Sequence, residues 1–174
     1  SYYWNMAPDK DATIGAILTT QEAPVLLGEY RQRFNNAYTV WDGSITYSSR
    51  FDQQAGIERE LDDDFRGHLF SKSLWDINEK WRTGLDIEVT SDDQYLSQYD
   101  IANEDVLENN LYVERCSDRD YALVRLSAFQ DLRVSERQTD QPNILPEIHT
   151  NFLGDPGGTL GGRWSAQVSA LGLE

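Results

Sequence analysis

The sequence lacks the features that mark several large classes of protein. Cys116 is the only cysteine, which excludes an internal disulfide framework. No run of 18 or more apolar residues occurs, so a transmembrane helix is excluded, and the first residues carry no secretory signal pattern. Basic residues are scarce: 15 Lys and Arg against 30 Asp and Glu give a net charge of −15. Such acidity argues against nucleic acid as a partner.

Motifs for covalent chemistry are also missing. There is no phosphate-binding loop with its lysine, no nucleophile elbow and no Cys/His dyad. His68 and His149 have no neighbouring ligand at metal-site spacing. We therefore expect no enzyme, no metal and no cofactor.

Two carboxylate clusters leave more than one interpretation open. They could bind a hard cation such as Ca²⁺, supply an acid/base pair as in glycosidases, or belong to solvated loops, which we favour. The clusters are Glu58, Glu60, Asp62, Asp63 and Asp64, and Asp92 with Asp93.

Alternation of apolar and polar residues recurs along the whole chain, and this pattern is typical of half-buried β-strands. In 81–90, for example, Leu85 and Ile87 alternate with Asp86 and Glu88. The chain is therefore predicted to be all-β. About nine strands are expected, near 11–19, 25–34, 43–51, 66–77, 81–90, 109–116, 121–130, 143–153 and 160–171.

The connections between these strands alternate in length. Short turns are expected at 77–80, 116–120 and 154–159, and long polar segments at 52–64, 91–108 and 131–142. An antiparallel up-and-down meander with one short-turn rim gives this alternation, as in outer-membrane barrels. Aromatic residues at strand ends fit the girdles of such barrels: Tyr38, Trp41, Phe51, Phe65, Trp75, Trp81, Tyr121 and Trp164. A soluble β-sandwich with the same periodicity remains the alternative.

Three stretches resemble one known family. YYWNMAPDKDATI (2–14) resembles the start of the barrel of LptD, the lipopolysaccharide-assembly protein of the outer membrane, also called the organic solvent tolerance protein. EVTSDDQYLSQY (88–99) and QPNILPEIHTNF (141–152) resemble later segments of that family in the same order. Within that family, this sequence is most similar to alphaproteobacterial members.

This resemblance implies a fold and a function. Residues 1–174 would be the N-terminal part of a large transmembrane outer-membrane β-barrel, including its first, seam-forming strand. The chain would belong to the translocon that inserts lipopolysaccharide into the outer leaflet. Its implied partners are lipopolysaccharide, the outer membrane, a plug lipoprotein similar to LptE inside the barrel, and a periplasmic lipopolysaccharide-bridge protein that binds a preceding domain. A general porin and a soluble β-sandwich binding module are the alternatives.

The resemblance also implies two groups of functional residues. A lateral gate at the first-strand seam would contain Tyr2, Tyr3, Asn5, Pro8, Ala12 and Ile14. Pro8 lacks a backbone donor, so near the start of strand 11–19 it would shorten the ladder at the seam. The residues expected to face the lumen are Glu29, Arg31, Arg33, Asp86, Glu88, Arg125 and Gln167.

Overall fold

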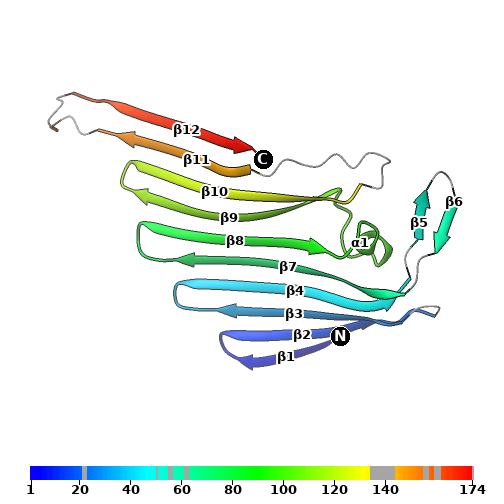
Figure 1. Ribbon diagram of the computed structural model, residues 1–174. Helices are drawn as coiled ribbons and strands as arrows, with labels where there is room; N and C mark the ends of the chain where they lie inside the picture. Colours follow the sequence, from blue (N-terminus) through cyan, green and yellow to red (C-terminus); the bar gives the residue numbers. More distant parts are fainter. Residues whose placement is uncertain are drawn as a thin grey trace.

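A computed structural model describes residues 1–20, 23–49, 51–54, 57–60, 63–133, 144–154, 157–158 and 162–173. Ten strands form one antiparallel sheet in the order β1-β2-β3-β4-β7-β8-β9-β10-β11-β12, and β5 and β6 form a separate hairpin (Figure 1). Each strand of the main sheet therefore pairs with its sequence neighbours, apart from the inserted hairpin. The expected all-β, antiparallel up-and-down meander is confirmed.

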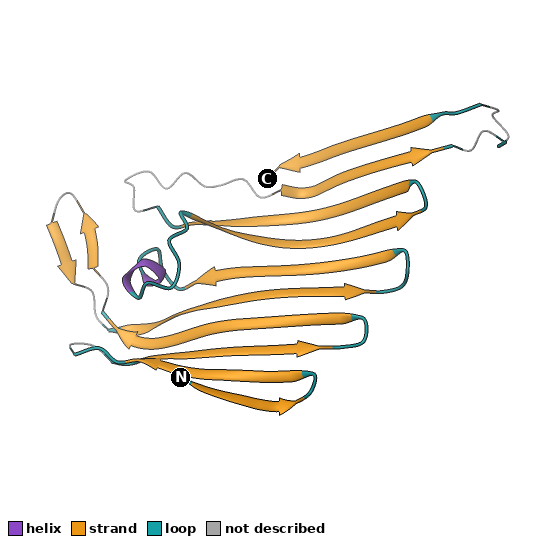
Figure 2. Cartoon of the chain, turned by 180° about the vertical axis from the view of Figure 1, so that it is seen from behind, coloured by secondary structure: helices purple, strands orange, loops and turns teal. Residues whose placement is uncertain are grey.

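The strands run from rim to rim of the sheet, and one short helix lies beside them (Figure 2). The first six strands are β1 (Tyr2–Ala7), β2 (Lys10–Ile17), β3 (Val25–Arg33), β4 (Ala37–Ser48), β5 (Phe51–Gln54) and β6 (Ile57–Glu60). The next elements are β7 (Asp64–Asp76), β8 (Trp81–Thr90), α1 (Tyr95–Gln98), β9 (Val106–Ser117), β10 (Asp120–Asp131), β11 (Ile144–Leu153) and β12 (Ser165–Leu173). In the described part of the chain, no helix is long and apolar enough to cross a membrane.

The structure corrects the predicted strands in three places. β1 was not predicted, because its aromatic residues Tyr2, Tyr3 and Trp4 follow one another and hide the alternation. The strands β5 and β6 occupy a segment that was expected to be the loop 52–64, apart from Phe51, which was expected to end strand 43–51. The last strand begins at Ser165 rather than near residue 160, so its connection to β11 is longer than the expected turn. The strand that was predicted to be the first, 11–19, corresponds to β2, because β1 precedes it in the sheet.

The register separates two faces of the sheet. One row of paired residues runs Asp11–Arg31–Val40–Lys72–Asp86 across five strands, so these side chains share a face. We call it the polar face. The other, apolar face carries large side chains that are exposed: Ile14, Leu26, Ile45, Tyr47, Phe65, Leu69, Trp75, Trp81, Val89, Leu111, Val124 and Val168.

The two rims differ as the sequence indicated. At one rim most connections are short, such as 8–9, 34–36 and 118–119, and the β11–β12 connection 154–164 is the longer exception. The other rim carries the segment 91–105, with α1, and the β5–β6 hairpin (Figure 1). We call these the short-turn rim and the long-loop rim.

Two strand glycines offer a matched test of the packing. A Cβ at Gly67 would meet the backbone carbonyl oxygen of Ser44 on the neighbouring strand, which cannot move without disturbing the ladder. A Cβ at Gly28 would meet nothing within 4 Å. We expect Gly67→Ala to destabilise the protein by about 1–3 kcal/mol and Gly28→Ala to be neutral or slightly stabilising. Thermal unfolding followed by circular dichroism would measure both, and equal effects would contradict this packing.

Candidate functional site

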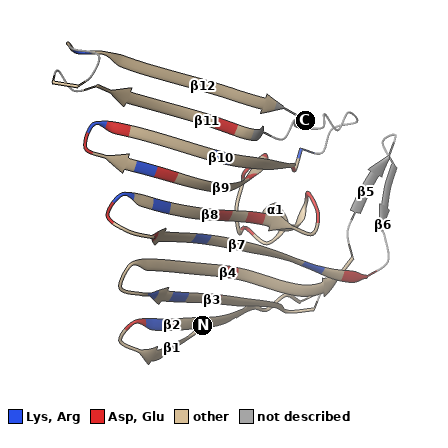
Figure 3. Cartoon of the chain, turned by 60° about the vertical axis from the view of Figure 1, so that its left-hand side comes forward, with Lys and Arg blue, Asp and Glu red and all other residues tan. Residues whose placement is uncertain are grey.

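The polar face holds all seven residues that the sequence predicted to face a lumen. The register places Glu29, Arg31, Arg33, Asp86, Glu88, Arg125 and Gln167 on this single face. Charged positions recur along these strands as well as in the turns (Figure 3). The seven residues nevertheless spread over β3, β8, β10 and β12, so they form a surface rather than one compact site.

Ion pairs link many of these charges across neighbouring strands. Arg31 Nε lies 2.8 Å from Asp11 Oδ1 and 3.1 Å from Glu29 Oε1. Arg125 Nη1 lies 3.8 Å from Glu147 Oε2 on β11. These pairs are partly exposed and each contributes little to stability. Their effect is to keep charged groups at fixed positions along a hydrated surface.

The predicted gate residues lie at the β1 edge of the sheet. Tyr2 pairs with Ile14, Tyr3 with Thr13, and Asn5 with Asp11, while Ala12 pairs with Trp4. The register shifts between Asn5 and Ala7, which disrupts the ladder at the end of β1. In the described residues, β1 pairs on one side only.

Pro8 lies outside the strands of the sheet. It lies in the turn between β1 and β2 rather than within a strand, so its missing N–H removes no bond from the ladder. Pro8 instead lines a hollow of about 640 Å³ at the short-turn rim, together with Arg31 and Arg33. The structure thus brings a predicted gate residue next to two predicted lumen residues.

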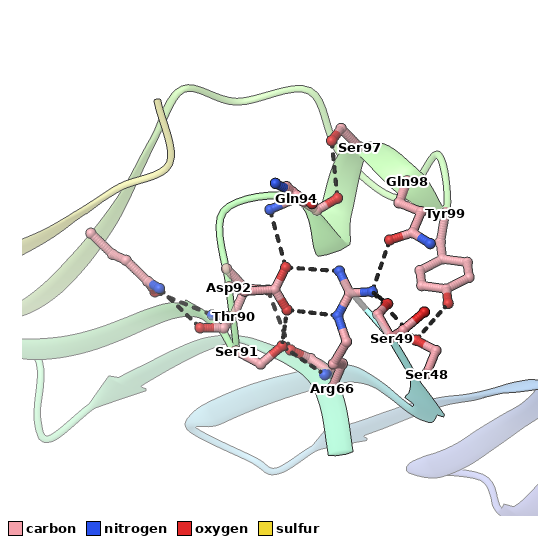
Figure 4. A network of polar contacts seen from close by, with 12 residues as sticks. Ser48, Ser49, Arg66, Thr90, Ser91, Asp92, Gln94, Ser97, Gln98 and Tyr99 are labelled. Atoms are coloured by element: carbon pink, nitrogen blue, oxygen red, sulfur yellow. Dashed lines mark hydrogen bonds and ion pairs between the residues drawn. The ribbon is translucent and has the colours of Figure 1, made fainter. Parts of the chain in front are cut away.

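A second feature of the polar face, which the sequence did not reveal, is the segment 91–105. We call it the strap, because it leaves β8 and folds over the polar face before β9 begins. Its first anchor is a buried ion pair: Arg66 on β7 donates to both carboxylate oxygens of Asp92, with Nε–Oδ2 2.9 Å and Nη2–Oδ1 2.8 Å (Figure 4). Asp92 was expected in a solvated loop, and this prediction was wrong, since both side chains are almost fully buried.

Arg66 also connects the strap to the neighbouring long connection. Its Nη1 donates to the carbonyl oxygen of Ser49 at 2.8 Å and to Oε1 of Gln98 at 2.8 Å (Figure 4). Ser49 directly precedes the β5–β6 insertion, and Gln98 ends α1. One buried guanidinium therefore joins two of the long connections of this rim.

The surroundings of Asp92 keep it ionised. Burial alone raises the pKa of a carboxyl group, but hydrogen bonds from Arg66 and Ser91, together with the Arg66 charge, outweigh burial and hold the pKa of Asp92 below its usual value. Burial raises the pKa of the Tyr95 phenol, which keeps it protonated. Tyr95 can therefore donate a hydrogen bond while Asp92 accepts several.

A chain of hydrogen bonds forms the second anchor of the strap. Tyr95 Oη lies 2.6 Å from Ser44 Oγ, Ser44 Oγ lies 2.6 Å from His68 Nδ1, and His68 Nε2 lies 2.8 Å from Asp42 Oδ1. Serine, histidine and aspartate in this order resemble a hydrolytic triad. Ser44, however, lies inside a central strand paired on both sides, where the ladder uses the backbone N–H groups that an oxyanion hole would need. This series of hydrogen bonds therefore holds the strap rather than serving as a nucleophilic site.

The remaining candidates show no converging chemistry. Asp62 lies outside the described residues, as do the side chains of Glu58 and Glu60 in β6. Within the described ranges, no three His, Cys, Asp or Glu side chains come close enough to hold a metal ion. Cys116 is exposed on the polar face.

Comparisons with known proteins agree on one family. The family model described as LptD, LPS transport system D, matches residues 64–171. The LPS-assembly protein LptD of Acinetobacter baumannii is 27% identical over 166 residues, covering 88% of this chain and 19% of that protein. The LPS-assembly protein LptD of Nitrosococcus oceani is 30% identical over 136 residues, covering 75% of this chain and 17% of that protein. The chain therefore spans less than a fifth of the length of these relatives.

The buried ion pair gives a prediction for acid conditions. Because the folded-state pKa of Asp92 is depressed, the stability that it contributes is fully present above the unfolded-state pKa of about 3.9. This stability is lost as the pH falls through the lower, folded-state pKa. We expect amide protection of the strap, measured by hydrogen exchange corrected for intrinsic rates, to stay constant from neutral pH to about pH 4 and to fall below it.

Matched variants identify the group responsible. Asp92→Asn leaves Arg66 buried without a counter-ion, which should weaken strap docking by about 3–5 kcal/mol at neutral pH and abolish the acid step. Asp76→Asn breaks the exposed pair with Arg82, whose Nε–Oδ1 distance is 2.6 Å, and should cost at most about 1 kcal/mol. An acid step that persists in Asp92→Asn would refute the assignment.

Proposed function

The chain belongs to the LptD family, and from this premise we propose that it forms part of the wall of an outer-membrane β-barrel that transports lipopolysaccharide. The observation that carries the proposal is the separation of the sheet into two faces. Large apolar side chains stand exposed along one face, and charged residues line the other. A wall between lipid and a watery lumen requires this division.

The lengths of the central strands support a membrane location. A transmembrane β-strand needs about 9–11 residues. The strands β3, β4, β7, β8, β9 and β10 have 9, 12, 13, 10, 12 and 12 residues. Aromatic side chains at strand ends, such as Trp75 and Trp81, stand exposed on the apolar face, where they would lie at the membrane interface.

We further propose that the polar face lines the lumen. Glu29, Arg31 and Arg33 on β3 and Asp86 and Glu88 on β8 would contact water, the sugars and phosphates of lipopolysaccharide, or a plug lipoprotein inside the barrel. Arginine binds phosphate through charge-assisted hydrogen bonds. A periplasmic bridge protein would bind a part of the full-length protein that lies outside this chain.

The lateral gate belongs to the same proposal, with β1 as the seam strand. In the closed barrel, the free edge of β1 would pair with the last strand, and this ladder must open for an amphipathic lipid to leave sideways. The register shift between Asn5 and Ala7 lies in the ladder between β1 and β2, and the local bend that such a shift gives to β1 would make regular pairing with the last strand harder near the short-turn rim. This shift takes over the role that the sequence assigned to Pro8.

Photo-crosslinking in cells tests the gate. We would place a photo-reactive residue at position 14 or at position 85 of the full-length protein and probe for lipopolysaccharide adducts. Ile14 and Leu85 both lie on the apolar face, but Ile14 is on β2, next to the seam strand, and Leu85 is on the central strand β8. We expect adducts at position 14 and none above background at position 85.

Two outcomes would contradict this proposal. Equal labelling at both positions would indicate general contact with membrane lipid rather than a path at the seam. Absence of adducts at position 14 in a correctly inserted protein would favour a plain barrel wall, as in a general porin.

A further inference from the structure

We propose that the strap, residues 91–105, is an internal strut that ties strands β3 to β10 into one rigid unit across the polar face, with Arg66 as its latch. The inference concerns the geometry of the sheet itself, so it stands apart from the transport proposal. It rests on an apolar cluster, a capped turn and a set of buried polar anchors that together hold the strap in place.

The apolar cluster joins strands that are not neighbours. Its buried members are Val25 at the start of β3, Tyr95, Leu96 and Tyr99 in the strap, Leu107 in β9, and Leu132 directly after β10. In the order of the sheet, β3 and β10 are five strand spacings apart, or about 24 Å. Strand pairing alone cannot bring these ends into one cluster, so the strap supplies the side chains that connect them.

Phe70 shows on which side the strap lies. Phe70 on β7 packs against the cluster, as do Ile17 and Leu27 at the long-loop ends of β2 and β3. Phe70 pairs with Asp42 and Glu88 and thus belongs to the polar face. This face therefore contains, at its long-loop end, a small core of its own beneath the strap.

The strap has a defined backbone shape. After the single turn of α1, the N–H of Ile101 bonds to the carbonyl oxygen of Leu96 at 2.9 Å, and the N–H of Asp100 to that of Ser97 at 3.3 Å. Asp100 adopts a φ of 55°, the left-handed conformation that reverses the chain after a helix. The reversal directs the chain toward β9, where the N–H of Leu132 bonds to the carbonyl oxygen of Asp105 at 2.9 Å.

Polar anchors fix the strap along its length. Arg66 and Asp92 hold its start, Ser44 holds Tyr95, and Ser48 Oγ lies 3.1 Å from Tyr99 Oη. All these partners on the sheet side belong to β4 and β7, the fourth and fifth strands in the order of the sheet. A strap bound at the centre and packed against both flanks resists flexing of the sheet between them.

The test uses the full-length protein purified in detergent, with two measurements on each variant. Hydrogen exchange of residues 95–101 reports whether the strap is docked. Electron paramagnetic resonance between spin labels, attached to genetically encoded residues at positions 26 and 128, reports the distance between β3 and β10. Leu26 and Ala128 are exposed on the apolar face, so the labels touch neither the strap nor its anchors.

Arg66→Ala should release the strap, and Arg82→Ala is the matched control because its ion pairs on the same face are half-exposed. We expect strap exchange to accelerate by at least about tenfold in Arg66→Ala, since it leaves Asp92 buried and unpaired. The narrow distance distribution between the labels should broaden at the same time. Arg82→Ala should change neither measurement.

Results that differ from these expectations would overturn part of the proposal. A released strap with an unchanged label distance would show that the strap is no strut. A strap that stays docked in Arg66→Ala would show that Arg66 is no latch. If that variant cannot be recovered folded, Leu96→Ala, which removes a side chain only 2% exposed, tests the strut with the latch intact.

Discussion

The pairing of every central strand on both sides is the constraint on which the rest of the structure depends. A continuous antiparallel ladder satisfies the backbone polar groups within the sheet, so the side chains alone decide what each face can contact. Because the side-chain period is two, the register assigns the residues along each regularly paired stretch of the sheet alternately to its two faces, with shifts only in the β10–β11 and β11–β12 ladders among the described strands from β2 onward. A shift of one residue in any strand would move its charges to the apolar face. The register is therefore what turns an acidic, rather hydrophilic chain into a sheet with an apolar surface.

The strap adds a constraint of a different kind. The ladder joins neighbouring strands only, whereas the strap joins strands separated by several others. Burying the Arg66–Asp92 pair costs desolvation free energy. The presence of such a buried pair is therefore better explained by the specific arrangement that it fixes than by a gain in net stability. Here the arrangement is a segment held on the polar face, with two long connections joined at one guanidinium.

Alternation in the sequence was sufficient to predict the fold class, the meander and the division into faces. Strand 81–90 was predicted to the residue, since its alternation is unbroken and its flanking turns are clear. β1 was missed because consecutive aromatic residues mask the period, so Pro8 was placed just before the first strand instead of in the turn between two strands. Asp92 was misjudged because a carboxylate in a polar segment looks solvated unless its partner is known, and Arg66 lies 26 positions earlier. Contacts between residues distant in sequence leave no local pattern, and such contacts hold the strap to the sheet.

The central claim is that the two faces meet different surroundings, lipid on one side and water on the other. Substituted-cysteine labelling along β8 of the full-length protein in its membrane tests it most directly, with single cysteines at positions 85 to 88. A water-soluble thiol reagent should label the cysteines in Asp86→Cys and Glu88→Cys, and a lipid-phase reagent those in Leu85→Cys and Ile87→Cys. Equal labelling of all four positions by the water-soluble reagent would contradict the account, because both faces would then be in water.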